Sequence, residues 1–179
     1  MSRTSSLAKV MVVAYDQSWP DLFDVEANRL CKTLGQPRAA LEHIGSTSVP
    51  GLWAKPIIDM LLTVPEISAL DADADRLRSL GYEVMGEYGI RGRRYYRRDD
   101  EQGIRRYQVH AFSEGSEAAR RHLMFRDYLR ATPERAGDYA ALKQQLADAH
   151  PDDIHAYVEG KDALIKTLIA EADHWSRDT

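Results

Sequence analysis

The chain has 179 residues, a formal net charge of −4 at pH 7 and a single cysteine. This length predicts one domain with one hydrophobic core, with or without a helical extension. The negative charge argues against broad nucleic-acid binding, which usually requires a basic surface, but it permits a local basic pocket. One thiol excludes an intramolecular disulfide and a cysteine-based zinc cluster. No apolar run is long enough for a membrane span or a signal peptide, so we expect a cytoplasmic protein that does not bind membranes.

The first two thirds of the chain alternate between strand and helix patterns. An extended segment is expected over residues 10–15, and a helix then begins after Ser18 and ends at Gly35. A short strand is expected over residues 39–44 and a buried strand over residues 56–64. A further helix and three strands follow, over residues 67–80, 82–87, 93–97 and 105–112.

The last third of the chain has only helical patterns, over residues 117–130, 133–149 and 152–174. We therefore predict a single α+β domain. In this domain residues 1–113 form an α/β core, and residues 114–179 form a C-terminal helical lobe.

A candidate phosphate site lies in residues 43–59. Backbone amides and small residues in a tight turn can hold phosphates, and the run Gly45-Ser46-Thr47-Ser48 suits that task. Asp59 follows within an apolar strand, where an unpaired charge is costly. A carboxylate there can hold a divalent metal against the phosphates, with Lys55 as its partner or as a phosphate ligand. The alternatives are an ordinary turn at Gly45-Ser46 and a purely structural ion pair at Asp59.

The string HIGSTSVPGL of residues 43–52, followed by KPIID of residues 55–59, resembles the signature of the GrpB family. A strand ending in Gly-Ser, followed by a spacer of 12 residues and then an Asp on a strand, is also similar to the polymerase-beta-type nucleotidyltransferases. The resemblance covers nearly the whole chain, including residues 15–23 and 125–130. It implies a nucleotidyltransferase-like mixed sheet flanked by helices, a nucleotide or other phosphorylated ligand, and a divalent metal such as Mg or Mn. Domains of this family also occur fused to dephospho-CoA kinase, which implies a link to coenzyme A metabolism.

The sequence departs from the pattern of active transferases. Those enzymes carry a second acid two residues after the first, where this chain has Leu61, and a third acid on a neighbouring strand. The expected neighbouring strand has no Asp or Glu but contains His110. Two-metal catalysis needs several carboxylates, whereas Asp59 with His110, and with His43 or Glu42, would suit a single ion. His110 is also a candidate general base, and both histidines could instead be structural.

Basic residues elsewhere are candidates for phosphate binding. Arginines crowd residues 91–98, and Arg94 is the one that we expect to serve the ligand, although the cluster could equally be a solvated face. Tyr139 and Lys143 lie four residues apart on one helix, and Tyr157 and Lys161 repeat that spacing on the next. Tyr139 and the two lysines are expected to face the ligand. The alternative is that the lysines lie at the surface over packed tyrosines.

Two hypotheses about function follow. The first is a metal-dependent enzyme of nucleotidyl or phosphoryl transfer that binds a nucleotide or another phosphorylated small molecule. The second is a non-catalytic ligand-binding or regulatory module that has lost the second catalytic acid. The C-terminal helices could also support a homo-oligomer.

Overall fold

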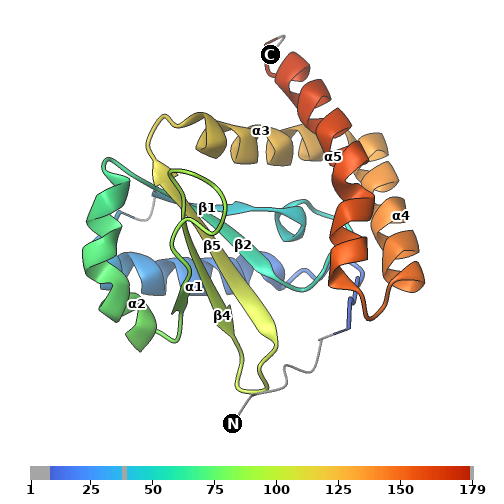
Figure 1. Cartoon of the computed structure of the whole chain (residues 1–179). Coiled ribbons are helices and arrows are strands. Elements are labelled where there is room, and N and C mark those ends of the chain that lie inside the picture. Colours follow the sequence, from blue (N-terminus) through green and yellow to red (C-terminus); the bar gives the residue numbers. More distant parts are fainter. Residues whose placement is uncertain (1–8, 38–39, 178–179) are drawn as a thin grey trace.

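The computed structural model describes residues 9–37 and 40–177. Within them, a five-stranded mixed sheet carries helices on both faces, and the last three helices pack together at one side (Figure 1). This arrangement confirms the predicted α+β fold with a C-terminal group of helices. Within the same residues, no helix is long and apolar enough to cross a membrane.

Helix α1 spans Trp19–Leu34. The Asp16 carboxylate accepts a hydrogen bond from the Ser18 amide at 2.8 Å, and the Ser18 side chain itself makes no capping bond. Gly35 ends the helix in the left-handed conformation that glycine adopts without strain. The apolar face of α1 packs on the sheet through Trp19, Phe23, Ala27, Leu30 and Leu34.

The first two strands, β1 (Leu41–Ile44) and β2 (Ile58–Val64), pair antiparallel. The loop between them begins with a short 3-10 turn, η2 (Ser46–Ser48). Before α1, residues 10–15 form no strand of the sheet, and Val13 makes only an isolated bridge to Ala54 of that loop.

The remaining strands complete the sheet in the order β1-β2-β5-β4-β3. They are β3 (Glu83–Val84), β4 (Arg94–Asp99) and β5 (Arg105–Ser113). β5 runs parallel to β2 and antiparallel to β4, which makes the sheet mixed. The predicted helix over residues 67–80 is instead a 3-10 segment, η3 (Ile67–Asp73), followed by the short α2 (Ala74–Ser79).

Alternation along the strands gives the sheet two different faces. Ile58, Met60 and Leu62 of β2 pack toward α1 in the main hydrophobic core. Asp59 and Leu61 therefore point to the opposite face. There, Leu61 packs with Ala119 of helix α3 (Glu117–Ala131), so that this helix covers one end of the face.

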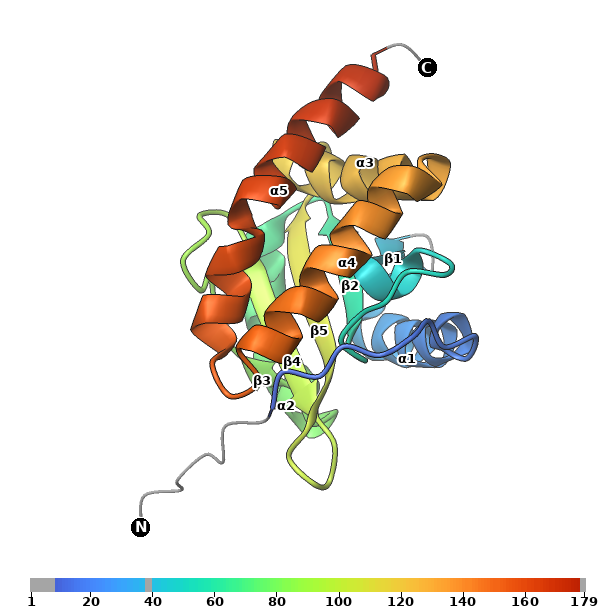
Figure 2. The same cartoon turned by 90° about the vertical axis from the view of Figure 1, so that its right-hand side faces the viewer.

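The C-terminal helices are α3 (Glu117–Ala131), α4 (Pro133–Ala149) and α5 (Ile154–Trp175). Figure 2 shows α4 and α5 lying beside each other over the sheet. Their contacts with α3 form a second hydrophobic cluster that includes Val49 and Leu52 of the β1–β2 loop. The C-terminal helices, which lie outside the sheet, thus fix the position of the β1–β2 loop by packing against it.

Candidate functional site

A cavity of about 240 Å³ lies between the β1–β2 loop, the start of β2, and helices α4 and α5. Most of the site residues predicted from the sequence line this cavity. They are Gly45, Ser46, Thr47, Lys55, Asp59, Tyr139, Lys143 and Lys161. Segments about 100 residues apart in the sequence therefore meet at one place.

Asp59 lies directly against the backbone of Gly45. A Cβ atom at position 45 would lie 2.5 Å from the Asp59 Oδ2 atom, which is closer than packed atoms approach. Gly45 also has φ 70° and ψ −175°, a conformation that is essentially restricted to glycine. The Gly-Ser turn and the carboxylate are thus one packed unit, and the Asp59 side chain remains 26% exposed.

The three hydroxyls of the turn have different roles. Thr47 Oγ1 donates to the Ile57 carbonyl at 3.1 Å, and Ser48 Oγ donates to the Gly45 carbonyl at 2.6 Å. Ser46 Oγ accepts a hydrogen bond from Lys143 Nζ at 2.9 Å. Ser46 is therefore the hydroxyl of this turn that joins the charged part of the cavity, whereas Thr47 and Ser48 hold the shape of the loop.

Lys143 ties α4 to the β1–β2 loop. Its side chain is buried, and its ammonium donates both to Ser46 and to the Trp53 carbonyl. The same ammonium lies 4.4 Å from the centre of the Tyr139 ring, one helical turn earlier. Such a position over an aromatic face stabilises a cation. The Tyr-x-x-x-Lys spacing therefore places the Tyr139 ring against the Lys143 ammonium, whose charge the ring stabilises.

Lys161 of α5 repeats this arrangement in the same cavity. Its ammonium lies 4.2 Å from the centre of the Tyr157 ring, and Lys55 Nζ lies 5.6 Å from the same ring. Tyr157 is fully buried, and its hydroxyl has no hydrogen-bond partner among the described residues. One buried ring thus underlies two lysines from different parts of the chain.

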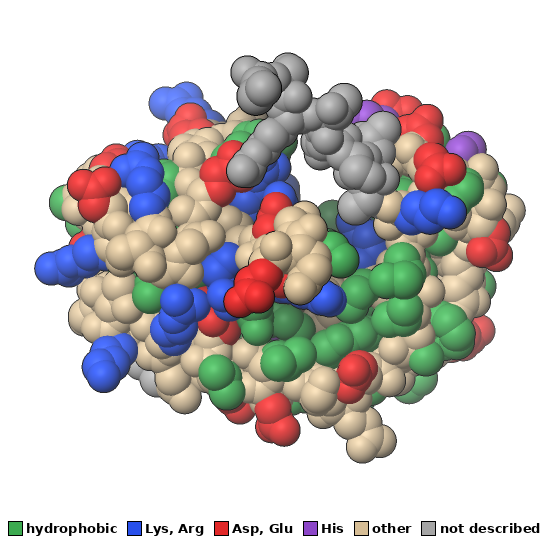
Figure 3. Space-filling model, turned by 90° about the horizontal axis from the view of Figure 1, so that it is seen from below, with side chains coloured by type: hydrophobic (Ala, Val, Ile, Leu, Met, Phe, Trp, Pro, Cys, Tyr) green, Lys and Arg blue, Asp and Glu red, His purple; other side chains and the backbone are tan. Residues whose placement is uncertain are grey.

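The cavity concentrates positive charge. Burial, together with the nearby charges of Lys161 and Lys55, lowers the pKa of Lys143 to about 7. Burial and the Lys55 charge likewise lower the pKa of Lys161 to about 8, although the negative charge of Asp59 opposes this. Burial also lowers the pKa of Lys55. The space-filling view from below shows Lys and Arg side chains interspersed with Asp and Glu side chains on this face of the molecule (Figure 3).

His110 connects Asp59 to the next strand. Its Nε2 atom lies 3.6 Å from Asp59 Oδ1, and its Nδ1 atom lies 3.4 Å from a guanidinium nitrogen of Arg93. A guanidinium can only donate, so Nδ1 is the acceptor and the proton of a neutral ring lies on Nε2. In this arrangement His110 presents an N–H group to Asp59.

Arg94, the arginine expected to serve the ligand, is not at the cavity. Its guanidinium makes two hydrogen bonds to the Asp71 carboxylate, at 2.6 and 2.8 Å, on the sheet face covered by α1. The pairing of β4 with β5 puts Tyr95 opposite His110, so side chains alternating with Tyr95 point away from the site. Arg93, which precedes the strand, reaches His110 instead.

His43 also lies apart from Asp59 and His110. It pairs with Met60 across the β1–β2 ladder and therefore shares the face opposite to Asp59. Its ring stacks on Phe23 at 4.8 Å, and its Nε2 atom contacts Thr47 Oγ1 at 3.0 Å. The metal set expected from Asp59, His110 and His43 is consequently not assembled.

The residues around Asp59 do not fit a two-metal centre. The position of the second acid holds Leu61, which is buried among Ile44, Phe112 and Ala119. The residue beside Asp59 on β5 is Gln108. Among the residues that the structure describes, no group of three or more His, Cys, Asp and Glu side chains could hold a metal ion.

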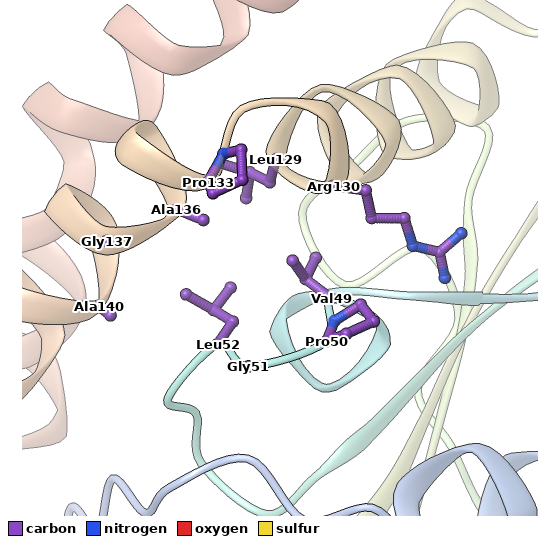
Figure 4. Close-up of a pocket in the computed structure, with 10 residues that line it drawn as sticks. All are labelled: Val49, Pro50, Gly51, Leu52, Leu129, Arg130, Pro133, Ala136, Gly137 and Ala140. Carbon is purple, nitrogen blue, oxygen red and sulfur yellow. The ribbon is translucent and has the colours of Figure 1, made fainter.

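A second hollow, of about 450 Å³, lies on the other side of the same loop (Figure 4). Val49, Pro50 and Leu52 face small residues of α4 across it, and the Arg130 guanidinium points away from its centre. The Arg130 side chain instead donates two hydrogen bonds to the Ser48 carbonyl, at 3.0 and 2.7 Å. This hollow is apolar, and the charged chemistry belongs to the cavity at Asp59.

The sequence pattern of the family described as GrpB protein matches residues 9–171 of this chain. The chain belongs to the GrpB family. It is also similar to the crystal structure of conserved protein GrpB from Enterococcus faecalis, at 44% identity and a TM-score of 0.86, over 92% of this chain and 99% of that one.

Relatives with longer chains contain a GrpB-like part. UPF0157 protein YqkA of Bacillus subtilis is 45% identical over 94% of this chain, which spans only 49% of YqkA. A dephospho-CoA kinase of Mycolicibacterium paratuberculosis is 27% identical over 99% of this chain and 49% of its own length. A looser structural likeness, at a TM-score of 0.47 and 12% identity over 74% of this chain, is to the Cid1 poly(U) polymerase.

Three residues lie at the site to which the sequence alone assigns no role. Gln108 lines the cavity beside Asp59, and period-two alternation from His110 places it on the same face. Tyr157 lies beneath the lysines, and its spacing from Lys161 was visible. Arg93 had no distinguishing signal, because its position depends on how the β3–β4 loop folds back onto the sheet.

Proposed function

We propose that this GrpB-family protein binds a phosphorylated small molecule, with a nucleotide as the leading class, and that the phosphate end enters the cavity beside Asp59. The observation that carries this proposal is the convergence of Lys55, Lys143 and Lys161 on one cavity. Asp59 is the only acid among the described residues that line it. The cavity therefore has an excess of positive charge that a phosphate group would balance.

The energetics support an anion as the occupant. Buried charges are costly unless they are paired, and the lowered pKa values of Lys143 and Lys161 express that cost. An anion between the lysines would stabilise their charged forms and raise these pKa values again. The Ser46 hydroxyl lies beside Lys143 and can donate to the same anion.

The size of the cavity limits what enters it. Sites that enclose a whole ligand usually have volumes of roughly 300–1,000 Å³, so the 240 Å³ at Asp59 suits a phosphate chain better than a complete nucleotide. The rest of the ligand would lie outside, along the sheet.

The neighbours of Asp59 favour binding over transfer. The Leu61 side chain lies in a hydrophobic cluster, and Gln108 takes the place beside Asp59 on β5. Two-metal transfer requires carboxylates at such positions. We therefore propose the ligand-binding or regulatory module in preference to the transferase. The similarity to a dephospho-CoA kinase adds coenzyme A precursors to the ligands worth testing.

The test is calorimetric titration of the whole chain with ATP, inorganic tripolyphosphate and dephospho-CoA, each with and without Mg²⁺. We expect saturable binding that Lys161→Met weakens about tenfold or more, because this change removes a charge that faces the phosphate. Lys166→Met is the matched control on the same helix. Lys166 is exposed and paired with Asp162, so its loss should leave affinity unchanged.

Absence of binding by all three compounds would refute the proposal. Equal weakening by Lys161→Met and Lys166→Met would show a diffuse charge effect and refute this location. Phosphorus NMR of the same mixtures tests for turnover, and Mg²⁺-dependent product formation would restore the transferase hypothesis.

A further inference from the structure

The β3–β4 loop, residues 85–93, presents an exposed tyrosine ring near the site. Figure 2 shows this loop projecting from the sheet on the side on which α5 lies. Tyr88 in this loop is 57% exposed, and its ring stacks on Tyr95 with centroids 5.4 Å apart and an angle of 25° between the planes. One face of the Tyr88 ring thus covers Tyr95, and no ring of another described residue stacks on the other face.

A row of rings connects Tyr88 to Asp59 along the sheet. The Tyr95 ring lies 5.2 Å from the His110 ring, and His110 Nε2 lies 3.6 Å from Asp59 Oδ1. Tyr95 and His110 are paired neighbours on β4 and β5, so they share the face that carries Asp59. Tyr88 therefore stands at the exposed end of this row, whose inner members Tyr95 and His110 are largely buried. The row ends at Asp59, which lines the phosphate cavity.

The loop holds Tyr88 in an uncommon backbone conformation. Tyr88 has φ 45°, and it is the only residue other than glycine with a positive φ in the described part of the chain. Arg93, which is 6% exposed, donates to the Tyr88 carbonyl at 2.7 Å and to the Glu87 carbonyl at 3.2 Å. The Glu87 carboxylate accepts from the Gly92 amide at 2.7 Å and closes the loop.

Backbone strain that the surroundings maintain points to a function when it occurs beside a site. Here the buried Arg93 side chain holds the backbone carbonyls of Glu87 and Tyr88. The same guanidinium lies 4.8 Å from the Tyr95 ring centre. Covering Tyr95 would not require this arrangement, because any apolar side chain with an ordinary backbone could do so. The arrangement specifically presents a flat aromatic surface in a fixed position.

We propose that Tyr88 is the stacking platform for the nucleobase of the ligand whose phosphates enter the lysine cavity. This inference rests on the proposed function and narrows its ligand class to nucleotides, as opposed to sugar phosphates or inorganic polyphosphates. The cavity at Asp59 leaves the ring-bearing part of such a ligand outside. Tyrosine is suited to hold it, because every base has a face that stacks on an aromatic ring.

The test compares ATP with inorganic tripolyphosphate, which has the phosphate chain but no base. The wild-type chain should bind ATP more tightly than tripolyphosphate. Tyr88→Ala should weaken ATP binding by roughly 5- to 150-fold, the usual range for loss of one base–aromatic stack, and leave tripolyphosphate binding unchanged. Tyr88→Phe keeps the ring and should bind ATP as the wild type does.

Ile90→Ala is the matched control, because Ile90 is an exposed apolar residue of the same loop. Saturation-transfer NMR gives a second measurement: irradiation of the protein should saturate the adenine protons, relative to the ribose protons, more strongly in the wild type than in Tyr88→Ala. The inference is overturned if ATP and tripolyphosphate bind equally, or if Tyr88→Ala retains full ATP affinity. If neither compound binds, the proposed function itself fails and this inference fails with it.

Discussion

Gly45 shows how one residue serves both the backbone and the site. Its positive φ excludes other residues on conformational grounds, and the Asp59 carboxylate occupies the space that a side chain would need. The first reason is local and readable as a turn signal in the sequence. The second depends on the pairing of β1 with β2, which brings Ile44 opposite Asp59.

Gly45→Ala should therefore lower the free energy of unfolding by more than strain alone. Backbone strain of this kind costs about 1–3 kcal/mol, and displacement of the carboxylate adds to it. Gly51→Ala is the control. Gly51 has φ 78° in the same loop, and a Cβ atom at position 51 would have no neighbouring atom within 4 Å. Urea unfolding measures both. An equal loss in the two variants would show that contact with Asp59 adds nothing.

Lys143 and Lys161 show what burial does to a charged residue, and they would make the proposed anion binding depend on pH. Their pKa values of about 7 and about 8 lie below the ordinary value for lysine, so at pH 8 both are partly or largely neutral. A bound anion would raise these values, and the chain would take up protons on binding. Below pH 6 both lysines are already charged, and the uptake would vanish.

We therefore expect the affinity for tripolyphosphate to fall as the pH rises from 7 to 9. Proton uptake is measured by calorimetry at pH 8 in two buffers that differ in ionisation enthalpy. Lys161→Met should reduce the number of protons taken up, which separates the contribution of the chain from that of the ligand. Proton uptake that is unchanged in this variant would contradict the assignment.

At the scale of elements, strong periodicity and local caps predicted the long helices well. Helix α5 begins where Asp153 accepts a hydrogen bond from the Ala156 amide, close to the predicted start at residue 152. The predicted helix over residues 67–80 became a 3-10 segment and a short α-helix. Aspartates recur in the first half of this segment, and aspartate favours turns over helix interiors. The apolar pattern alone therefore predicted too long an α-helix.

The β1–β2 loop illustrates an element whose shape other elements impose. Its residues carry the motif of the proposed phosphate site, but their positions depend on Lys143 of α4 and on the packing of Val49 and Leu52 against the C-terminal helices. The sequence therefore identifies the motif. The residues of the C-terminal helices that hold the loop in place could be expected only from the family resemblance.

At the scale of the whole molecule, a buried ionic network joins α1 to the far strands. Glu26 is 3% exposed, and its two carboxylate oxygens accept from the Tyr82 hydroxyl and from Arg98, each at 2.8 Å. The network crosses the main core, on the face opposite to the site. It connects segments more than 50 residues apart.

Glu26→Ala should destabilise the fold by about 3–5 kcal/mol, because it leaves the Arg98 charge without its buried partner. Arg29→Ala is the control: Arg29 is 41% exposed and lies 3.5 Å from the same carboxylate, so its loss should cost about 1 kcal/mol or less. Chemical denaturation measures both losses. A loss for Glu26→Ala no larger than for Arg29→Ala would show that the network contributes little.

The sequence by itself determined the order of helices and strands and the place of the site. These depend on short-range patterns: capping residues, apolar periodicity and the Gly-Ser turn before Asp59. Only the tertiary structure decided which side chains meet there. The register of β4 on β5 turned Arg94 away, strand alternation turned His43 away, and helix packing brought the lysines of α4 and α5 onto one cavity. Periodicity indicates which face of a helix or strand is apolar. Which element packs against that face is decided by contacts between segments far apart in the chain.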